Sequence, residues 1–124
     1  MQKLNSKFKT DLTQRTYSLS LAVINLMNNL PQKRAVWVIA DQLLRSSTSI
    51  GANIVEARAS SSRLEFKKFY EISLKSANET KYWFNLLKDA KFVSEKDVQS
   101  LIQETDEISR MLGSSVMKLK NIKF

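Results

Sequence analysis

The chain has 124 residues, a length that fits one domain with a hydrophobic core of its own. It holds two Gly and one Pro, too few for the frequent turns of a β-sandwich or barrel. It holds no Cys or His, which excludes disulfides, thiolate metal sites, Cys nucleophiles and His bases. The 20 basic and 12 acidic residues give a net charge of +8, which favours an anionic partner such as nucleic acid or an anionic membrane surface.

Apolar spacing predicts a first helix over residues 11–30, which Pro31 ends. A second apolar strip on this helix is formed by Tyr17, Leu21 and Ile24. It indicates contact with more than one neighbour, either inside the chain or in another subunit. The expected core face is Leu12, Thr16, Leu19, Val23, Leu26 and Leu30.

A second helix is predicted over residues 32–58. Gly51 lies inside it, where Gly costs about 1 kcal/mol relative to Ala. Gly51 is therefore either a weak spot or a place where another backbone comes close. The expected core face is Val36, Ile39, Leu43, Ser47, Ile50, Ile54 and Ala57.

Two further helices are predicted over residues 63–90 and 94–119. Ser62 and Ser94 precede them, each with an acidic residue three positions later, a pattern typical of a capping box. The expected core faces are Phe66, Phe69, Tyr70, Ala77, Thr80, Phe84 and Leu87 on the third helix, and Val98, Leu101, Ile102, Thr105, Ile108, Leu112, Val116 and Leu119 on the fourth.

The connections between these helices are short, so helices adjacent in sequence become antiparallel neighbours. The sequence therefore predicts an all-α fold, an up-down-up-down antiparallel four-helix bundle, as a single domain over residues 1–124. The apolar stretch 19–27 is interrupted by Ser20 and Asn25, which indicates neither a signal peptide nor a membrane span. We expect a cytoplasmic protein, which the lack of Cys fits.

Polar side chains follow one face of the second and third helices, beside the core. If residues 59–62 form the hairpin turn, Arg45 lies near Ser76 and within one turn of Glu79. We then expect an interhelical ion pair and hydrogen bonds that fix the register. The residues of this polar strip are Arg45, Ser49, Asn53 and Glu56 on the second helix, and Glu65, Ile72, Ser76, Glu79 and Trp83 on the third.

The carboxylates Glu56, Glu65 and Glu79 leave a Mg²⁺ site or a catalytic role as an alternative. Bundles that do metal chemistry with carboxylates usually add the motif Glu-x-x-His, however, and the chain has no His. It also lacks the glycine-rich phosphate loops and the Ser nucleophile motif G-x-S-x-G. We therefore expect no enzyme, no catalytic residue, no metal and no cofactor.

Two stretches, QLLRSSTSIGANIVEA at 42–57 and FKKFYEISLKSANETKYW at 66–83, carry a family resemblance. The chain resembles the four-helix-bundle proteins encoded in intervening sequences of bacterial 23S ribosomal RNA genes. The matching residues are Arg45, Ser46, Ser49, Ile50, Asn53, Ile54 and Glu56, then Phe66, Phe69 or Tyr70, Ile72, Ser76 and Glu79.

The resemblance implies a bacterial, non-enzymatic bundle that assembles into a ring-like homopentamer. It also implies kinship with the accessory variability determinant of diversity-generating retroelements, a basic pentameric barrel that binds nucleic acid and a reverse transcriptase. The strip Arg45, Ser49, Asn53, Glu56, Ser76 and Glu79 coincides with the family pattern, which favours a structural or assembly role for it.

The basic residues are concentrated at one end of the predicted bundle. The N-terminus, the turn between the second and third helices and the C-terminus share that end, and Asp11, Glu56 and Glu65 are its acidic residues, for a net charge of +7. The candidate nucleic-acid-binding residues are Lys3, Lys7, Lys9, Arg58, Arg63, Lys67, Lys68, Lys118, Lys120 and Lys123.

Two functions follow from these patterns. The first is a non-catalytic homo-oligomer that binds RNA or DNA through its basic end. The alternative is a scaffold or adaptor for another protein, for example a reverse transcriptase, without direct binding of nucleic acid. The second apolar strip of the first helix and Trp37 favour some protein contact.

Overall fold

The computed structural model describes residues 11–121. This part of the chain holds four helices and no strand, so the predicted all-α four-helix bundle is confirmed. None of these helices is long and apolar enough to cross a bilayer. The helices are α2 (Leu12–Met27), α3 (Arg34–Arg58), α4 (Arg63–Asp89) and α5 (Glu95–Lys120).

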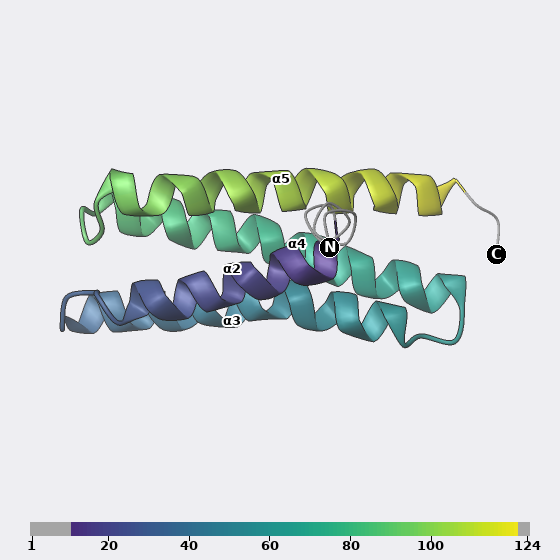
Figure 1. Ribbon diagram of the computed structural model, residues 1–124, viewed down its shortest axis with the longest axis horizontal. Coiled ribbons are helices and arrows are strands. Elements are labelled where there is room, and N and C mark those ends of the chain that lie inside the picture. Colours follow the sequence, from purple (N-terminus) through teal and green to yellow (C-terminus); the bar gives the residue numbers. More distant parts are fainter. Residues whose placement is uncertain (1–10, 122–124) are drawn as a thin grey trace, which may run out of the picture.

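Each helix runs antiparallel to the one before it, in an elongated bundle (Figure 1). Helix α3 packs against α4, and α4 packs against α5. Helix α2 contacts both α3 and α5 and so closes the bundle. The up-down-up-down order expected from the short connections is therefore the one observed.

Helix α2 ends at Met27, before the expected end at Leu30. Leu30 precedes Pro31, whose ring disfavours the helical conformation in the residue before it. Lys33 is still extended, with φ −125° and ψ 145°, so α3 begins at Arg34 rather than at residue 32. The bounds of α4 and α5 differ from the predicted ones by one residue at most.

Both predicted caps form. The Ser62 hydroxyl accepts a hydrogen bond from the backbone N–H of Glu65 at 3.1 Å, and the Glu65 carboxylate accepts one from the N–H of Ser61 at 3.2 Å. The Ser94 hydroxyl accepts from the N–H of Asp97 at 3.2 Å. These bonds satisfy N–H groups that lack a partner within the helix, and so fix where α4 and α5 begin.

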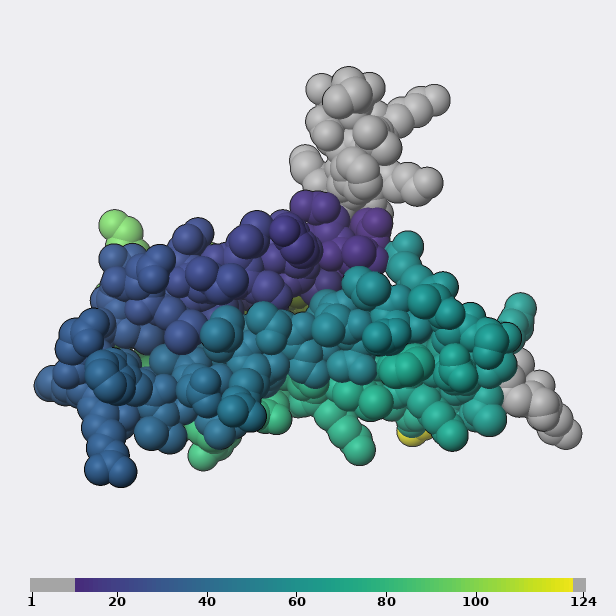
Figure 2. All heavy atoms as spheres, turned by 90° about the horizontal axis from the view of Figure 1, so that it is seen from below, coloured from purple at the N-terminus to yellow at the C-terminus, as the bar shows by residue number. Residues whose placement is uncertain are grey.

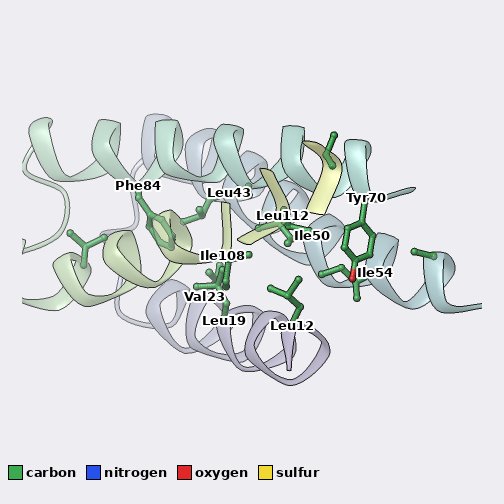
Figure 3. Close-up of a cluster of buried hydrophobic side chains, with 14 of the residues drawn as sticks. Leu12, Leu19, Val23, Leu43, Ile50, Ile54, Tyr70, Phe84, Ile108 and Leu112 are labelled. Atoms are coloured by element: carbon green, nitrogen blue, oxygen red, sulfur yellow. The ribbon is translucent and has the colours of Figure 1, made fainter. Parts of the chain in front are cut away.

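The core runs along the bundle axis and draws on all four helices, as the close-up in Figure 3 shows. Most of the predicted core positions are buried. The partly buried ones are Leu26, Leu30, Ile39, Phe66, Phe69, Leu101, Ile102 and Leu119. The buried Thr16 hydroxyl bonds to its own helix, since it donates to the carbonyl of Leu12 at 2.7 Å. Four further buried residues are not among the predicted core positions, and these are Ala40, Ser46, Ser73 and Ser109.

Candidate nucleic-acid interface

One end of the bundle collects basic side chains from three helices. The end of α3, the start of α4 and the end of α5 lie together there (Figure 1). Of the predicted basic residues that lie within residues 11–121, all are exposed except Lys67, which is half-buried. Lys3, Lys7, Lys9 and Lys123 lie outside the described residues. The basic end as described consists of Arg58, Arg63, Lys67, Lys68, Lys118 and Lys120.

Helix α2 begins short of this end. It covers only part of the length of α3, as Figures 1 and 2 show. Its cap residue Asp11 accepts a hydrogen bond from the N–H of Thr13 at 2.9 Å and also pairs with Arg58, whose Nη2 lies 3.0 Å from Oδ1. The start of α2 is thus bound to the last residue of α3, and Arg58 has an internal counter-charge.

A cleft of about 540 Å³ opens beside this ion pair. Tyr70 is 7% exposed and lines the cleft together with Asp11, Arg58 and Met111. Burial raises the pKa of the Tyr70 hydroxyl, because it disfavours the phenolate; the charge of Arg58 opposes the shift and that of Asp11 adds to it. Tyr70 is therefore neutral at physiological pH and links the basic end to the core.

The charges at this end differ in their relation to the helix dipoles. Arg58, Lys118 and Lys120 lie in the last turns of α3 and α5, where a cation complements the dipole. Arg63 begins α4, where a cation opposes the dipole, and Glu65 is the acidic residue of that first turn. Helix stability accounts for the first group of charges but not for Arg63.

The polar strip differs from its prediction in register. The Ser76 hydroxyl lies 2.9 Å from that of Ser49, and not beside Arg45. Thr80 lies opposite Ser46, with their hydroxyl oxygens 2.9 Å apart. The reason is the path of the turn: α4 begins farther out along the axis than α3 ends (Figure 1). The pairing is therefore displaced from the one that a turn straight across would give.

The prediction of an interhelical ion pair at Arg45 is wrong. Arg45 pairs with Asp41 of its own helix at 3.2 Å, and Glu79 accepts a hydrogen bond from Nε1 of Trp83 at 2.9 Å. Hydroxyl groups make the hydrogen bonds between α3 and α4 instead, including one from Ser73 to the carbonyl of Ile50 at 2.8 Å.

Asn53 and Glu56 make no hydrogen bond with α4 in the part of the chain that the structure describes. Asn53 donates to the carbonyl and the hydroxyl of Ser49, at 2.8 and 3.0 Å, within its own helix. Glu56 is exposed. Over residues 11–121, no group of three or more acidic side chains is placed to hold a metal ion.

An ion-pair cluster that the sequence analysis missed joins α2 to α5. The Arg15 guanidinium lies 2.6 Å from Glu104 and 3.0 Å from Glu107, and its side chain is 18% exposed. The hydrogen bond to Glu104 is the largest cause of a raised pKa at Arg15, so Arg15 stays charged despite its burial. The sequence signal for such a cluster is the spacing of Glu104 and Glu107, which lie three residues apart and so share one face of α5.

Comparisons with known proteins give a matching family and a matching solved structure. The family described as 23S rRNA-intervening sequence protein matches residues 9–114. The chain belongs to this family. A search among curated proteins found no match. A solved structure from Bacteroides thetaiotaomicron, a protein of unknown function from the S23 ribosomal protein family, is 34% identical with a TM-score of 0.80, over 86% of this chain and 98% of that one.

The strip that carries the resemblance to the intervening-sequence proteins lies on the α3–α4 side of the bundle, whereas a second unusual face lies on the α2–α3 side. Tyr17, Leu21 and Ile24 are 62%, 46% and 45% exposed, so the alternative that they join the core of this chain is wrong. Val55 of α3 is 56% exposed and lines the same groove as Tyr17. A largely apolar groove of about 560 Å³ runs here, lined by Thr13, Gln14, Tyr17, Ser20, Thr48, Gly51, Ala52 and Val55.

Proposed function

We propose that this intervening-sequence protein is a non-catalytic homo-oligomer that binds RNA or DNA through its basic end. The observation that carries the proposal is the set of cations gathered there from α3, α4 and α5. Among the described residues, Arg58 is the one member of this set that forms an ion pair. The other ammonium and guanidinium groups are available to phosphates, whose counterions they would release.

Arg63 adds a second argument. A cation in the first turn of a helix costs stability, whereas an anion bound there is favoured by the dipole. Lys67 and Lys68 follow one turn later on the same helix. A phosphate at the start of α4 would therefore turn an unfavourable arrangement of charge into a favourable one.

The apolar groove between α2 and α3 supports the homo-oligomeric part of the proposal. Large apolar side chains exposed together are uncommon on a monomer and mark contact surfaces. The polar strip lies on the other side of α3, where Ser49 and Ser76 bond to each other between α3 and α4. A contact between unlike surfaces is head-to-tail, which closes into a ring when the rotation permits. A ring would repeat the basic end around one rim.

The scaffold function remains the second candidate, and the same groove favours it. Val55 in this groove is 56% exposed, and Trp37, which lies outside it on α3, is 60% exposed. An adaptor would use such side chains to hold a protein partner. The two functions differ in what the basic end does, since a pure scaffold needs no contact with phosphate.

Charge reversal separates the two functions. Changing Lys67, Lys68, Lys118 and Lys120 to Glu should abolish binding of RNA and DNA in a filter assay, while light scattering shows the assembly unchanged. The matched control reverses Lys33, Arg34, Lys88 and Lys96 at the opposite end, with the same change in net charge, and should keep binding. An equal loss of binding in both variants would contradict a localised interface. If the wild-type protein binds neither RNA nor DNA at low salt, the scaffold function is the one that remains.

The oligomeric part has its own test. Val55→Glu places a charge in the apolar groove and should shift the mass measured by light scattering toward the monomer. Met117→Glu is the control, because Met117 is 62% exposed on α5, outside the groove. A wild-type protein that is a monomer at micromolar concentration would contradict the homo-oligomer.

A further inference from the structure

One face of α4 points away from the rest of the bundle. Positions seven apart on a helix return to nearly the same face, about 10.5 Å farther along the axis. Lys68, Lys75 and Tyr82 have this spacing, and all three are exposed. The line that they form starts at the basic end and leads along α4 to an aromatic ring.

The two lysines of this line have no internal counter-charge. Over residues 11–121, neither Lys68 nor Lys75 lies within ion-pair distance of a carboxylate. Glu71 is the acidic residue between them in sequence, and it is half-buried. An anionic chain laid along α4 would meet two ammonium groups about 10.5 Å apart, a span of about three nucleotides in a stacked strand.

Tyr82 is held in place although it is 61% exposed. Its ring lies edge-on to that of Trp83, with the ring centroids 4.9 Å apart and an interplanar angle of 78°. Trp83 is itself fixed, because it packs against the core and donates a hydrogen bond to Glu79 at 2.9 Å. Tyr82 is thus a pre-positioned aromatic surface open to solvent.

The surroundings of Tyr82 favour a nucleic acid over a protein. A protein partner would need apolar surface around the ring to form a dry contact. The neighbours on this face of α4 are instead Lys75, Asn78, Glu79 and Asp89, all exposed and polar, and the Glu79 carboxylate accepts the hydrogen bond from Trp83. An exposed aromatic ring beyond a line of lysines is an arrangement by which proteins bind single strands, with the charges on the backbone and the ring on a base.

We propose that a single strand of RNA or DNA follows the outer face of α4 from the basic end and stacks an unpaired base on Tyr82. This inference rests on the proposed nucleic-acid binding and adds its path and its substrate class. A single strand is required because the bases of a duplex already stack on one another and leave no face for the ring. From Lys68 to Tyr82 the path is about 21 Å long, or about six nucleotides of a stacked strand.

Affinities of a labelled 12-nucleotide single-stranded RNA and of the same sequence as a duplex test the inference. Tyr82→Ser should weaken binding of the single strand by about 5- to 150-fold and leave the duplex unchanged. Tyr82→Phe keeps the ring and should bind as the wild type does. Lys75→Gln should lower the slope of log affinity against log salt by about 0.7 for the single strand, whereas Lys96→Gln at the opposite end should not.

The outcomes separate this inference from the proposed function. If Tyr82→Ser binds the single strand as tightly as wild type while reversal of the basic end abolishes binding, the path along α4 is wrong and the basic end stands. Equal losses on the single strand and the duplex, or an equal loss in Tyr82→Phe, would also overturn the stacking role. If the wild type binds no nucleic acid, both the inference and the proposed function fail.

Discussion

Thr16 of α2 lies directly against Gly51 of α3. A Cβ at Gly51 would lie 3.4 Å from the Cβ of Thr16 and only 3.0 Å from its Oγ1, and the second distance is shorter than such atoms normally approach. Thr16 is fully buried, and its hydroxyl is bound to the carbonyl of Leu12 at 2.7 Å, which leaves it little room to move. Of the two interpretations of Gly51, the close approach of another helix is therefore the correct one.

Alanine at the two glycines should have different effects on stability. In Gly113→Ala, nothing lies within 4 Å of the new Cβ, so the gain in helix propensity of about 1 kcal/mol should appear in full. In Gly51→Ala, crowding against Thr16 should cancel that gain or reverse it. Urea unfolding of both variants measures the difference. A gain at Gly51 as large as that at Gly113 would show that α2 and α3 are not closely packed there.

Lys91 is the one non-glycine residue with positive φ in residues 11–121, at 63°. It follows the end of α4, where its N–H donates to the carbonyl of Lys88 and that of Phe92 donates to Leu87, each at 3.0 Å. This is a helix end that favours Gly at its left-handed position. Lys91→Gly should stabilise the protein by about 1 kcal/mol, measured by chemical unfolding.

The control for this substitution is Lys91→Ala. It removes the same charge but keeps the Cβ, so it should give no comparable gain. A rise in stability shared by both variants would assign the effect to charge and not to the backbone.

The hydroxyls of Ser46 and Thr80, 2.9 Å apart, couple α3 to α4 inside the core. Either Ser46→Ala or Thr80→Val should cost about 1 kcal/mol, because each leaves the other hydroxyl with one partner fewer. The double variant should cost less than the sum, since no unmatched hydroxyl is left. A double-mutant cycle in urea measures this coupling; strictly additive costs would mean that the two groups do not interact.

Because the pKa of Tyr70 is raised, we expect the folded protein to lose stability in alkali. This pKa is raised in the folded state, chiefly by burial, so the folded protein holds a proton that the unfolded chain releases first. The contribution is complete below the ordinary tyrosine pKa of about 10 and is lost as the pH rises through the folded value. Tyr70→Phe should therefore lose less stability than wild type between pH 9 and pH 11, by urea unfolding at each pH. Tyr17→Phe, at an exposed ring, is the control. If the free energy of unfolding falls equally with pH in wild type and in Tyr70→Phe, the effect is contradicted.

The fold could be predicted from the sequence because its signals are local. Leu19 and Val23 lie four positions apart on one helical face of α2, and both are buried. Ser62 caps α4, as the Glu three residues after it indicated. Each of these features depends on neighbours within a few positions.

The register between α3 and α4 depends on the path of a short turn, which helical spacing does not define. A turn straight across would have brought Ser76 to Arg45, but α4 starts farther out and Ser76 meets Ser49. The partner of Arg45 was visible in the sequence as Asp41, four residues before it on the same helix. A local ion pair of this kind competes with any pair across the helices.

The candidate site could be predicted only in outline. Topology places Arg58, Arg63 and Lys118 at one end of the bundle, but the pairing of Arg58 with Asp11 depends on where α2 begins. The exposure of Tyr17 on α2 depends on which neighbours the helix has, and apolar spacing alone does not distinguish a core face from a contact face.

The salt dependence of RNA and DNA binding by the wild-type protein tests the central claim most directly. Filter binding to each nucleic acid at low and moderate salt should show tight binding that weakens steeply, by about 0.7 in log affinity per log unit of salt for each phosphate contacted on a single strand. The slope should fall when Lys67, Lys68, Lys118 and Lys120 are reversed and persist when the opposite end is reversed. No binding to either nucleic acid at low salt would contradict the claim.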